Sequence, residues 1–506
     1  MEPASAGPRA KKARPASAHP AQCRCPKCHA GTLTTKQMHA ATAAAALAAA
    51  AASGAAPGPP PEPLARSEWA CRLKPEVQAQ LQPHFGDERI SRILKRLAIP
   101  PGVTTLRVNT LRTDRGALLA KLRSLGVLLS PLPARPLLPE AVELPTPPAR
   151  SPLLGELVVS VDRVCGEAVL RGASIFAPGL KSLPRGVQVG SVVSVVVDIE
   201  GKDTRGQTTP CAGTHIYVGN GIARMDRSSI LSAGKGLAVE MTEQIFAHPP
   251  LMGVLEDRYL LQNLPSIVAG RLLAPEAGER VLDMCAAPGG KTTHLAMMMQ
   301  DRGELVACDR SAKKAAIIAA KAERFGITCV NAKKMDSRKL MLHDATQHAA
   351  ANGHAVTDAA TGRTRYPGEY FDKILLDPTC SALGLRPRFV QDNVSLVDLV
   401  GFASYQRVLL HHAVKLLKPG GVMVYSTCTW NPEENEGNVA YALAKFPLKL
   451  VAPEQHFGDP GMVVCGLSAE DAKLVQRFDP DSSDYDCIGF FAAKFVKTAP
   501  FADDFK

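Results

Sequence analysis

The chain has 506 residues, 46% hydrophobic and 21% charged, so it can bury ordinary globular cores in roughly two to four domains. Lysine and arginine number 59 against 48 acidic residues, a net charge of +11 that favours a polyanionic partner, although a basic tail alone would give the same balance. There is no signal-peptide pattern, and the longest low-polarity run, residues 40–56, is mostly alanine. We therefore expect a cytoplasmic protein with reduced cysteines, no membrane span and no obligate protein partner.

Residues 1–66 have the composition of a disordered, basic, alanine- and proline-rich tail. Such a stretch cannot bury enough apolar surface to offset the entropy lost on ordering. Because it is nearly free of acidic residues, it also fits a targeting segment for an organelle or the nucleus. Cys23, Cys25 and Cys28 could ligate zinc, but no matching second pair of ligands follows, so we expect an incidental cluster and no metal.

Three segments follow the tail. Residues 67–154 mix a helical apolar pattern with a strand-like alternation, which predicts a small α+β segment. Residues 155–247 contain short β-like runs broken by glycine and proline, which is typical of a small β barrel. Over residues 248–498 strands alternate with helices, which predicts an α/β, Rossmann-like parallel sheet. Within it, residues 343–369 lack periodicity and are expected to form an inserted loop.

The last segment contains four apolar runs typical of buried strands. They are residues 281–283, 305–309, 373–377 and 422–425. A helix is expected from Ser311, a favourable N-cap residue, to Phe325, because Gly326 follows and can end the helix.

A turn of small residues, Asp283–Thr292, follows the first of these strands. Its glycines allow the backbone to approach a ligand closely. The second strand ends in Asp309, 19 residues beyond Gly290, where an acidic side chain can bind ribose hydroxyls. The glycine spacing matches neither a phosphate-binding loop nor a dinucleotide fingerprint, so the pattern favours a nucleoside cofactor without pyrophosphate, namely S-adenosylmethionine.

Cysteines follow the other two strands, at Cys380 and Cys428. Two cysteines at one sheet edge, without metal-pair spacing, suggest thiol chemistry, although each alone could be a small buried hydrophobe. A thiolate that attacks carbon 6 of cytosine makes carbon 5 nucleophilic enough to accept a methyl group. Asp377 is placed to stabilise the charge pushed into the ring.

Together these motifs resemble the Sun-domain RNA (cytosine-5) methyltransferases over roughly residues 68–497. The matching elements are Arg107–Thr110, Gln262–Ser266, Asp283–Thr292, Asp377–Ser381 and Tyr425–Glu436. Two further stretches, Gly166–Ala173 and Gly219–Gly221, resemble a PUA domain inserted in the chain. This resemblance implies the branch of the family that acts on transfer RNA near its acceptor end.

The resemblance implies a role for each motif residue. The cofactor would be wrapped by Cys285, Ala286, Ala287, Pro288, Gly289, Gly290 and Lys291. Asp309 would bind its ribose and Asp336 its adenine. Asp377 would contact both the cofactor and the base, and Lys291 would also face the base.

The two cysteines receive different roles from the resemblance. Cys428, in the Ser-Thr-Cys element, would be the nucleophile, and Cys380 would assist release of the methylated RNA after the carbon 5 proton is lost. DNA cytosine methyltransferases instead place the nucleophile on the cysteine that follows the Asp loop. The family usually has Asp-Ala-Pro-Cys-Ser-Gly where this chain has Asp377–Ala382 with proline one position earlier, which alters the loop around Cys380.

Basic residues of the PUA-like segment are candidates for phosphate contacts, with a solvated basic face as the alternative. They are Arg171, Lys181, Lys202 and Arg205. Two other functions remain open, a DNA cytosine-5 methyltransferase and an RNA-binding protein with a decayed enzyme domain. The PUA-like segment argues against the first. The second is disfavoured by four intact site residues, Asp309, Asp336, Asp377 and Cys428.

Overall fold

The computed structural model describes residues 63–127, 129–149, 151, 156–342, 354–358, 363–482 and 484–501. Residues 1–62 of the predicted tail, including its cysteines, lie outside the described residues. Of the helices in the described part of the chain, none combines the length and apolar character that a bilayer crossing needs. The cysteines of the described part are all free thiols.

The N-terminal segment combines helices with a three-stranded antiparallel sheet in the order β3-β2-β9. Its elements are η2 (Arg66–Glu68), β1 (Arg72–Leu73), α2 (Pro75–Leu97), β2 (Val103–Val108), α3 (Arg115–Ser124), β3 (Ala141–Pro145) and β9 (Tyr259–Leu261). The predicted tail boundary at residue 66 is too late. Leu64 packs against a hydrophobic cluster, and its N–H donates to the carbonyl of His215 at 2.9 Å.

A five-stranded sheet in the order β4-β6-β7-β8-β5 occupies the middle of the chain. Its elements are β4 (Val158–Val161), α4 (Arg163–Leu170), β5 (Ile175–Phe176), η3 (Ala177–Gly179), β6 (Val192–Asp198), β7 (His215–Ala223), α5 (Arg227–Ala233) and β8 (Leu237–Gln244). Only β4 and β6 are parallel. Gly219 in β7 has φ +132°, and a Cβ there would lie 2.2 Å from the carbonyl oxygen of Glu243, so this close strand approach requires glycine.

A larger sheet forms the C-terminal half, in the order β12-β11-β10-β15-β17-β20-β18, with β19 also pairing with β20. Its strands are β10 (Arg280–Asp283), β11 (Glu304–Asp309), β12 (Val330–Lys334), β15 (Phe371–Leu376), β17 (Leu417–Thr427), β18 (Leu448–Leu450), β19 (Gln476–Phe478) and β20 (Phe490–Lys497). The four predicted strands are present as β10, β11, β15 and β17, which pair in parallel. β20 runs antiparallel to its neighbours.

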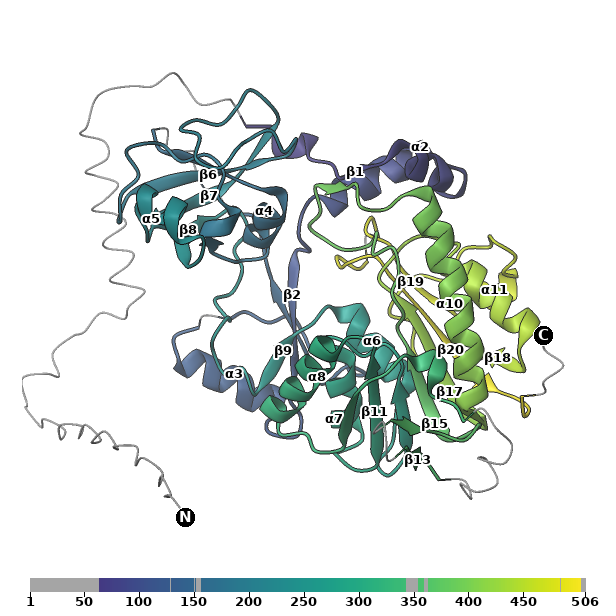
Figure 1. Ribbon diagram of the computed structural model, residues 1–506. Coiled ribbons are helices and arrows are strands. Elements are labelled where there is room, and N and C mark those ends of the chain that lie inside the picture. The colour runs from purple at the N-terminus through teal and green to yellow at the C-terminus, as the bar shows by residue number, and fades with distance from the viewer. Residues whose placement is uncertain are drawn as a thin grey trace, which may run out of the picture. The chain divides into compact units, whose positions relative to one another are not determined.

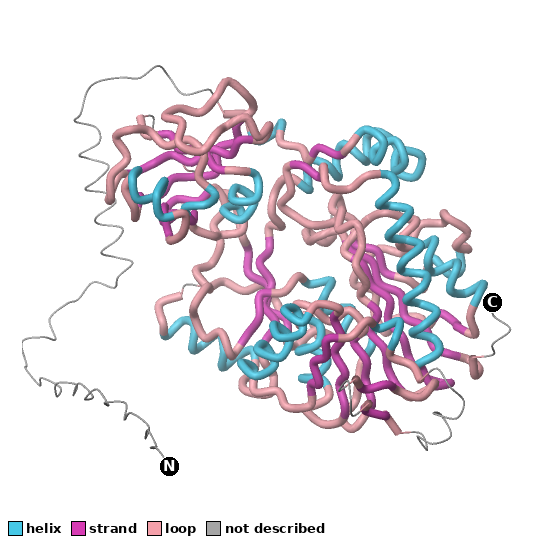
Figure 2. The backbone as a smooth tube through the Cα atoms, viewed as in Figure 1, coloured by secondary structure: helices cyan, strands magenta, loops and turns pink. Residues whose placement is uncertain are grey.

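Helices cover both faces of this sheet. They are α6 (Leu264–Leu273), α7 (Gly290–Met298), α8 (Ala312–Phe325), η4 (Ser337–Lys339), α10 (Leu396–Leu416), α11 (Glu436–Lys445) and α12 (Ala469–Ala472). In Figure 1, α6, α7 and α8 lie on one face and α10 and α11 on the other, and Figure 2 shows the same strands between those helices. The predicted helix is confirmed as α8, with the Ser311 hydroxyl accepting from Lys314 N and Gly326 at φ +72° ending it.

The predicted insertion at residues 343–369 is only partly loop. Its described residues contain a short antiparallel pair, β13 (Val356–Thr357) and β14 (Thr364–Arg365), which the irregular pattern did not reveal. Residues 343–353 and 359–362 lie outside the described residues. A further two-residue strand, β16 (Val390–Gln391), pairs in parallel with β1 and connects the N-terminal segment to the C-terminal half.

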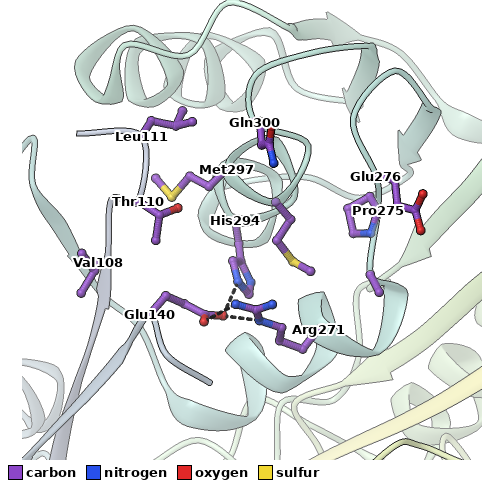
Figure 3. Close-up of a pocket in the computed structure, with 12 residues that line it drawn as sticks. Val108, Thr110, Leu111, Glu140, Arg271, Pro275, Glu276, His294, Met297 and Gln300 are labelled. Carbon is purple, nitrogen blue, oxygen red and sulfur yellow. Dashed lines mark hydrogen bonds and ion pairs between the residues drawn. The ribbon is translucent and has the colours of Figure 1, made fainter. Parts of the chain in front are cut away.

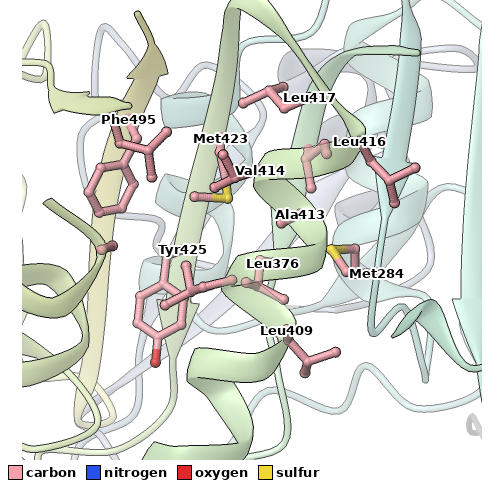
Figure 4. Close-up of a cluster of buried hydrophobic side chains, with 14 of the residues drawn as sticks. Met284, Leu376, Leu409, Ala413, Val414, Leu416, Leu417, Met423, Tyr425 and Phe495 are labelled. Atoms are coloured by element: carbon pink, nitrogen blue, oxygen red, sulfur yellow. The ribbon is translucent and has the colours of Figure 1, made fainter. Parts of the chain in front are cut away.

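The core between the sheet and α10 fixes the loops that carry the site. Leu376 at the end of β15 and Tyr425 near the end of β17 are fully buried there, beside Leu409 and Val414 of α10 (Figure 4). Each such side chain contributes about 1.5–3 kcal/mol on burial. Strand order reverses direction between β10 and β15, so the loops after these two strands face each other, and this is where open α/β sheets bind ligands.

Candidate active site

A cavity of about 320 Å³ opens at the carboxyl ends of β10, β11, β15 and β17. It is lined by Met284, Cys285, Ala287, Asp309, Arg310, Ser311, Lys314, Met335, Asp336, Ser337, Asp377, Pro378, Thr379, Cys380, Ala382, Tyr405, Leu409 and Cys428. The lining combines carboxylates, apolar side chains and the two cysteines of interest. One cavity therefore joins the predicted nucleoside site to the predicted thiol site.

Cys380 and Cys428 meet at this cavity, with their sulfur atoms 3.4 Å apart. The loops after β15 and β17 bring together two residues that are 48 positions apart in the sequence. The hydrogen bond with Cys380 lowers the pKa of Cys428 below its usual value, against the opposing effect of burial. The same contact and burial raise the pKa of Cys380. Cys428 is therefore the thiol that ionises more readily, and thiolate is the nucleophilic form.

Lys291 and Asp377 form an ion pair beside the cysteines. The Lys291 ammonium lies 2.8 Å from Asp377 Oδ2, and the Ser426 hydroxyl donates to Asp377 Oδ1 at 2.7 Å. Burial lowers the pKa of Lys291, but the attraction and hydrogen bond of Asp377 outweigh it and the pKa is raised overall. Lys291 therefore stays charged, and its charge also helps to lower the pKa of Cys428.

The expected cofactor residues divide into two groups. Cys285, Ala287, Asp309, Asp336 and Asp377 line the cavity. The others belong to the same loop or to the start of α7 and are absent from the lining: Ala286, Pro288, Gly289, Gly290 and Lys291. Gly289 has φ +88° and begins α7, so its backbone conformation favours glycine there.

The chemistry of the lining fits S-adenosylmethionine. Asp309 offers an acceptor for ribose hydroxyls at the end of β11, and Met335, Tyr405 and Leu409 provide apolar surface for an adenine ring. The Asp336 carboxylate, which the sequence suggested as an adenine contact, already has a hydrogen-bond partner within the protein. It accepts hydrogen bonds from the Arg338 guanidinium at 2.6–3.2 Å, and this contact lowers its pKa.

Sequence reasoning did not identify two contributors to the site. The Ser426 hydroxyl donates to Asp377 and orients it. Ser426 lies within β17, directly before Thr427 and Cys428, and the sequence pattern gave its side chain no role of its own. Tyr405 reaches the cavity from α10, and the guanidinium groups of Arg310 and Arg338 each lie 5.5 Å from its ring. Only the repeat of apolar positions, about every 3.6 residues along α10, could have indicated that Tyr405 faces the sheet.

A buried arginine holds the cofactor loop from the N-terminal segment. Arg107 in β2 is fully buried and donates to Gln262 Oε1 at 2.5 Å, to Thr293 Oγ1 at 2.7 Å and to the carbonyl of Gly290. Burial lowers its pKa to about 9. The Arg-Val-Asn-Thr element is therefore tied to the start of α7, directly behind the cofactor loop.

A second cavity, of about 630 Å³, lies at the opposite end of α7 (Figure 3). There Glu140 accepts hydrogen bonds from His294 Nε2 at 2.9 Å and from Arg271 Nε at 2.8 Å. Burial lowers the pKa of His294 to about 4, so the ring is neutral. This cluster anchors the N-terminal segment to α6 and α7.

The four predicted RNA contacts are already engaged with the protein to different degrees. Lys202 pairs with Glu200 at 2.5 Å, and Lys181 lies 3.8 Å from Asp162. Arg205 donates to the backbone carbonyls of Ala177 in η3 and Ile230 in α5, so it links two helices of its own segment. Arg171 follows α4, and burial lowers its pKa.

One mixed cluster of possible metal ligands occurs in the described residues. His84, Glu433 and Cys465 bring one ligand atom each within 4.8 Å of one another. Three ligands fall short of the four that a structural zinc site uses. The Cys465 thiol instead donates to Glu433 at 3.4 Å.

Comparison with known proteins identifies similar sequences and folds. A family model described as 16S rRNA methyltransferase RsmB/F matches residues 270–496. The chain is 38% identical to mouse tRNA (cytosine(72)-C(5))-methyltransferase NSUN6, over 84% of this chain and 96% of that protein. It is 33% identical to Arabidopsis thaliana rRNA (cytosine-C(5))-methyltransferase NOP2C, over 84% of this chain and 90% of that protein. The crystal structure of NSun6 from Pyrococcus horikoshii with SFG superposes with a TM-score of 0.68 at 32% identity, covering 84% of this chain and 99% of that one.

The fold and the site define a Rossmann-type, S-adenosylmethionine-dependent methyltransferase with a pair of cysteines at the mouth of its cofactor cavity. The full-length similarity to curated relatives identifies the family within that class. The chain belongs to the RNA (cytosine-C5)-methyltransferase family that includes RsmB/F and NSUN6.

Proposed function

We propose that this enzyme transfers a methyl group from S-adenosylmethionine to carbon 5 of a cytosine in transfer RNA, near the acceptor end. The observation that carries the proposal is the Cys380–Cys428 pair, 3.4 Å apart, at a cavity that also presents Asp309. Three relatives whose names specify cytosine 72 of transfer RNA match 82–84% of the chain at 35–38% identity, against 33% for the ribosomal RNA methyltransferase NOP2C, which supports transfer RNA as the substrate.

In the proposed reaction Cys428 attacks carbon 6 of the target cytosine as a thiolate, forming a C6–S bond. The Lys291–Asp377 pair holds a proton next to the base and stabilises the negative charge that this attack pushes into the ring. When bound, S-adenosylmethionine would supply an electrophilic methyl group to the electron-rich carbon 5; its S–CH3 bond would break and S-adenosylhomocysteine would leave.

Cys380 acts second. The family resemblance implies only that it assists release once the carbon 5 proton is lost, and we propose in addition that Cys380, as a thiolate, is the base that takes this proton. The electrons of that C–H bond re-form the C5=C6 double bond, the C6–S bond breaks, and Cys428 leaves as a thiolate. The hydrogen bond and charge of Cys428 contribute to the raised pKa of Cys380. Both effects disappear once Cys428 is bonded to carbon 6, so Cys380 becomes easier to deprotonate at the stage where a base is needed.

We further propose that residues 155–247 are a PUA-like RNA-binding domain, between an N-terminal segment at 67–154 and a catalytic domain at 248–498. A cavity of about 280 Å³ supports this arrangement, because it is lined by Arg163 and Val164 of α4 together with Ser381 and Ala382 beside the catalytic cysteine. RNA held on the middle sheet would reach the active site along this cleft. Arg171 and Lys181 are better candidates for RNA contact than Arg205, whose guanidinium already donates to carbonyls of η3 and α5.

The test is methyl transfer to a transfer RNA transcript, a matched transcript with cytosine 72 replaced by uridine, a ribosomal RNA fragment and a DNA copy. Transfer to the first alone supports the proposal. Transfer to the uridine variant would move the target elsewhere in the molecule. Transfer to the DNA copy or only to the ribosomal fragment would replace the proposed substrate, and S-adenosylmethionine binding without any transfer would support a decayed enzyme.

A further inference from the structure

Glu434 and Asn435 are neighbours in the loop between β17 and α11, and both side chains are fully buried. The mechanism above uses neither of them. Asn435 contacts the residues on both sides of Cys428, whereas Glu434 contacts the residue after Cys380 and shares with Gln406 the hold on the residue before it.

Glu434 acts on the segment around Cys380. The backbone N–H of Ser381 donates to Glu434 Oε2 at 3.0 Å. Gln406 of α10 donates to the same oxygen at 2.8 Å and also to the carbonyl of Thr379 at 3.1 Å. The peptide groups before and after Cys380 are therefore both tied to a unit made of one carboxylate and one amide.

Asn435 acts on the segment around Cys428. The Thr427 hydroxyl donates to Asn435 Oδ1 at 2.6 Å, and Asn435 Nδ2 donates to the carbonyl of Thr429 at 3.0 Å. The residues before and after the nucleophile are thus held by one side chain. The carbonyl of Cys428 itself accepts from the N–H of Gly384 at 3.0 Å.

The two loops are also joined directly. The hydroxyls of Ser381 and Thr429 lie 2.8 Å apart, and the Ser381 hydroxyl donates to Glu434 Oε1. Asn431 donates to that oxygen at 3.1 Å, so the carboxylate of Glu434 faces four donors. Burial raises the pKa of Glu434, and the four donors reduce that rise without cancelling it.

We propose that Glu434 and Asn435 are positioning residues with separate duties, Glu434 fixing the thiol of Cys380 for product release and Asn435 fixing the thiol of Cys428 for attack. Adjacent residues of one loop thereby set the separation of two sulfur atoms that lie in the loops after β15 and β17. The proposal rests on the two-cysteine mechanism proposed above.

Two nearly isosteric substitutions separate these duties. Glu434→Gln places an amide N–H₂ against donors, which loosens the chain around Cys380. Asn435→Asp removes the donor to the Thr429 carbonyl, which loosens the chain around Cys428. Loss of one buried hydrogen bond of this kind corresponds to roughly a tenfold effect on the step it supports.

The experiment measures single-turnover methyl transfer, multiple-turnover rate and the fraction of protein covalently linked to RNA, using the full chain and transfer RNA. Glu434→Gln is expected to keep single-turnover transfer, to lose roughly tenfold in multiple turnover and to accumulate adduct as Cys380→Ala does. Asn435→Asp is expected to lose roughly tenfold in single-turnover transfer without accumulating adduct. Glu433→Gln, whose side chain contacts Cys465 and not these loops, is the matched control and should resemble the wild type.

An equal loss of all three quantities in both variants would indicate a common structural role and would overturn the proposal. So would the absence of adduct in Glu434→Gln while Cys380→Ala accumulates it. If Cys380→Ala itself gives no adduct, the proposed mechanism has failed instead. Unchanged affinity for S-adenosylmethionine verifies folding. If Glu434→Gln does not fold, Ser381→Ala replaces it; this variant removes the hydroxyl that contacts Glu434 and Thr429, and the same accumulation of adduct is expected.

Discussion

Replacement of Arg477 by methionine should destabilise the protein strongly, because this arginine neutralises carboxylates inside the catalytic half. Its side chain is 1% exposed, and its guanidinium donates to both oxygens of Glu436 at 2.8 and 2.9 Å and to both oxygens of Asp479 at 2.9 Å. It also donates to the carbonyl of Trp430, in the loop that follows Cys428. The Arg477→Met variant keeps most of the side-chain volume and removes the charge.

The size of the expected loss in unfolding free energy depends on which hydrogen-bond and ion-pair partners each carboxylate keeps in Arg477→Met. Asp479 keeps an ion pair with Arg89 at 2.7 Å, so its loss is partial. Glu436 is fully buried and keeps the N–H of Met462 at 3.0 Å. Leaving a buried charge without its partner costs about 3–5 kcal/mol, and we expect Arg477→Met to lose that much unfolding free energy.

The assay is urea denaturation of the wild type, Arg477→Met, Glu436→Gln and the double variant. The double variant should recover at least about 2 kcal/mol relative to the sum of the two single losses, because the stranded charge is gone. A loss below about 1 kcal/mol in Arg477→Met, or simple additivity of the two substitutions, would refute the reasoning from burial and charge.

Three further outcomes are expected. Lys291→Gln should move the rising limb of the pH–rate profile to higher pH, because the Lys291 charge lowers the pKa of Cys428 and the thiolate is the reactive form. An unchanged limb would show that the Lys291 charge does not influence the ionisation of Cys428. Asp309→Ala should weaken S-adenosylmethionine binding roughly tenfold by calorimetry, through loss of a ribose acceptor, and unchanged affinity would exclude that role. Gly219→Ala should cost about 3 kcal/mol or more in urea denaturation, since its Cβ would lie 2.2 Å from the Glu243 carbonyl, and a neutral result would contradict so close an approach of β7 to β8.

The sequence predicted the parallel half of the large sheet well, because its strands are continuous apolar runs with chemistry at their ends. Helix α8 was predicted to its last residue, since Ser311 and Gly326 are strong local signals. The antiparallel strand β20 escaped prediction, because pairing with distant β17 and β18 is not encoded in any local period.

In the site, too, the residues that follow strands could be predicted, whereas the contacts that depend on packing between distant elements could not. Cys380 and Cys428 stood out because each follows a strand, and parallel strands bring their ends to one edge. The arrangement behind them could not be read from the chain. Gln406 occupies a helix position like any other, and its contacts to Thr379 and Glu434 arise only when α10 packs on the sheet.

The most direct test of the central claim is to incubate transfer RNA and S-adenosylmethionine with wild type, Cys428→Ala and Cys380→Ala, and to resolve protein–RNA adducts by denaturing electrophoresis. From the two-cysteine mechanism we expect a stable adduct that carries a methyl group in Cys380→Ala. In Cys428→Ala we expect neither methyl transfer nor an adduct. An adduct in Cys428→Ala, or full methyl transfer by that variant, would contradict the assignment of Cys428 as the nucleophile.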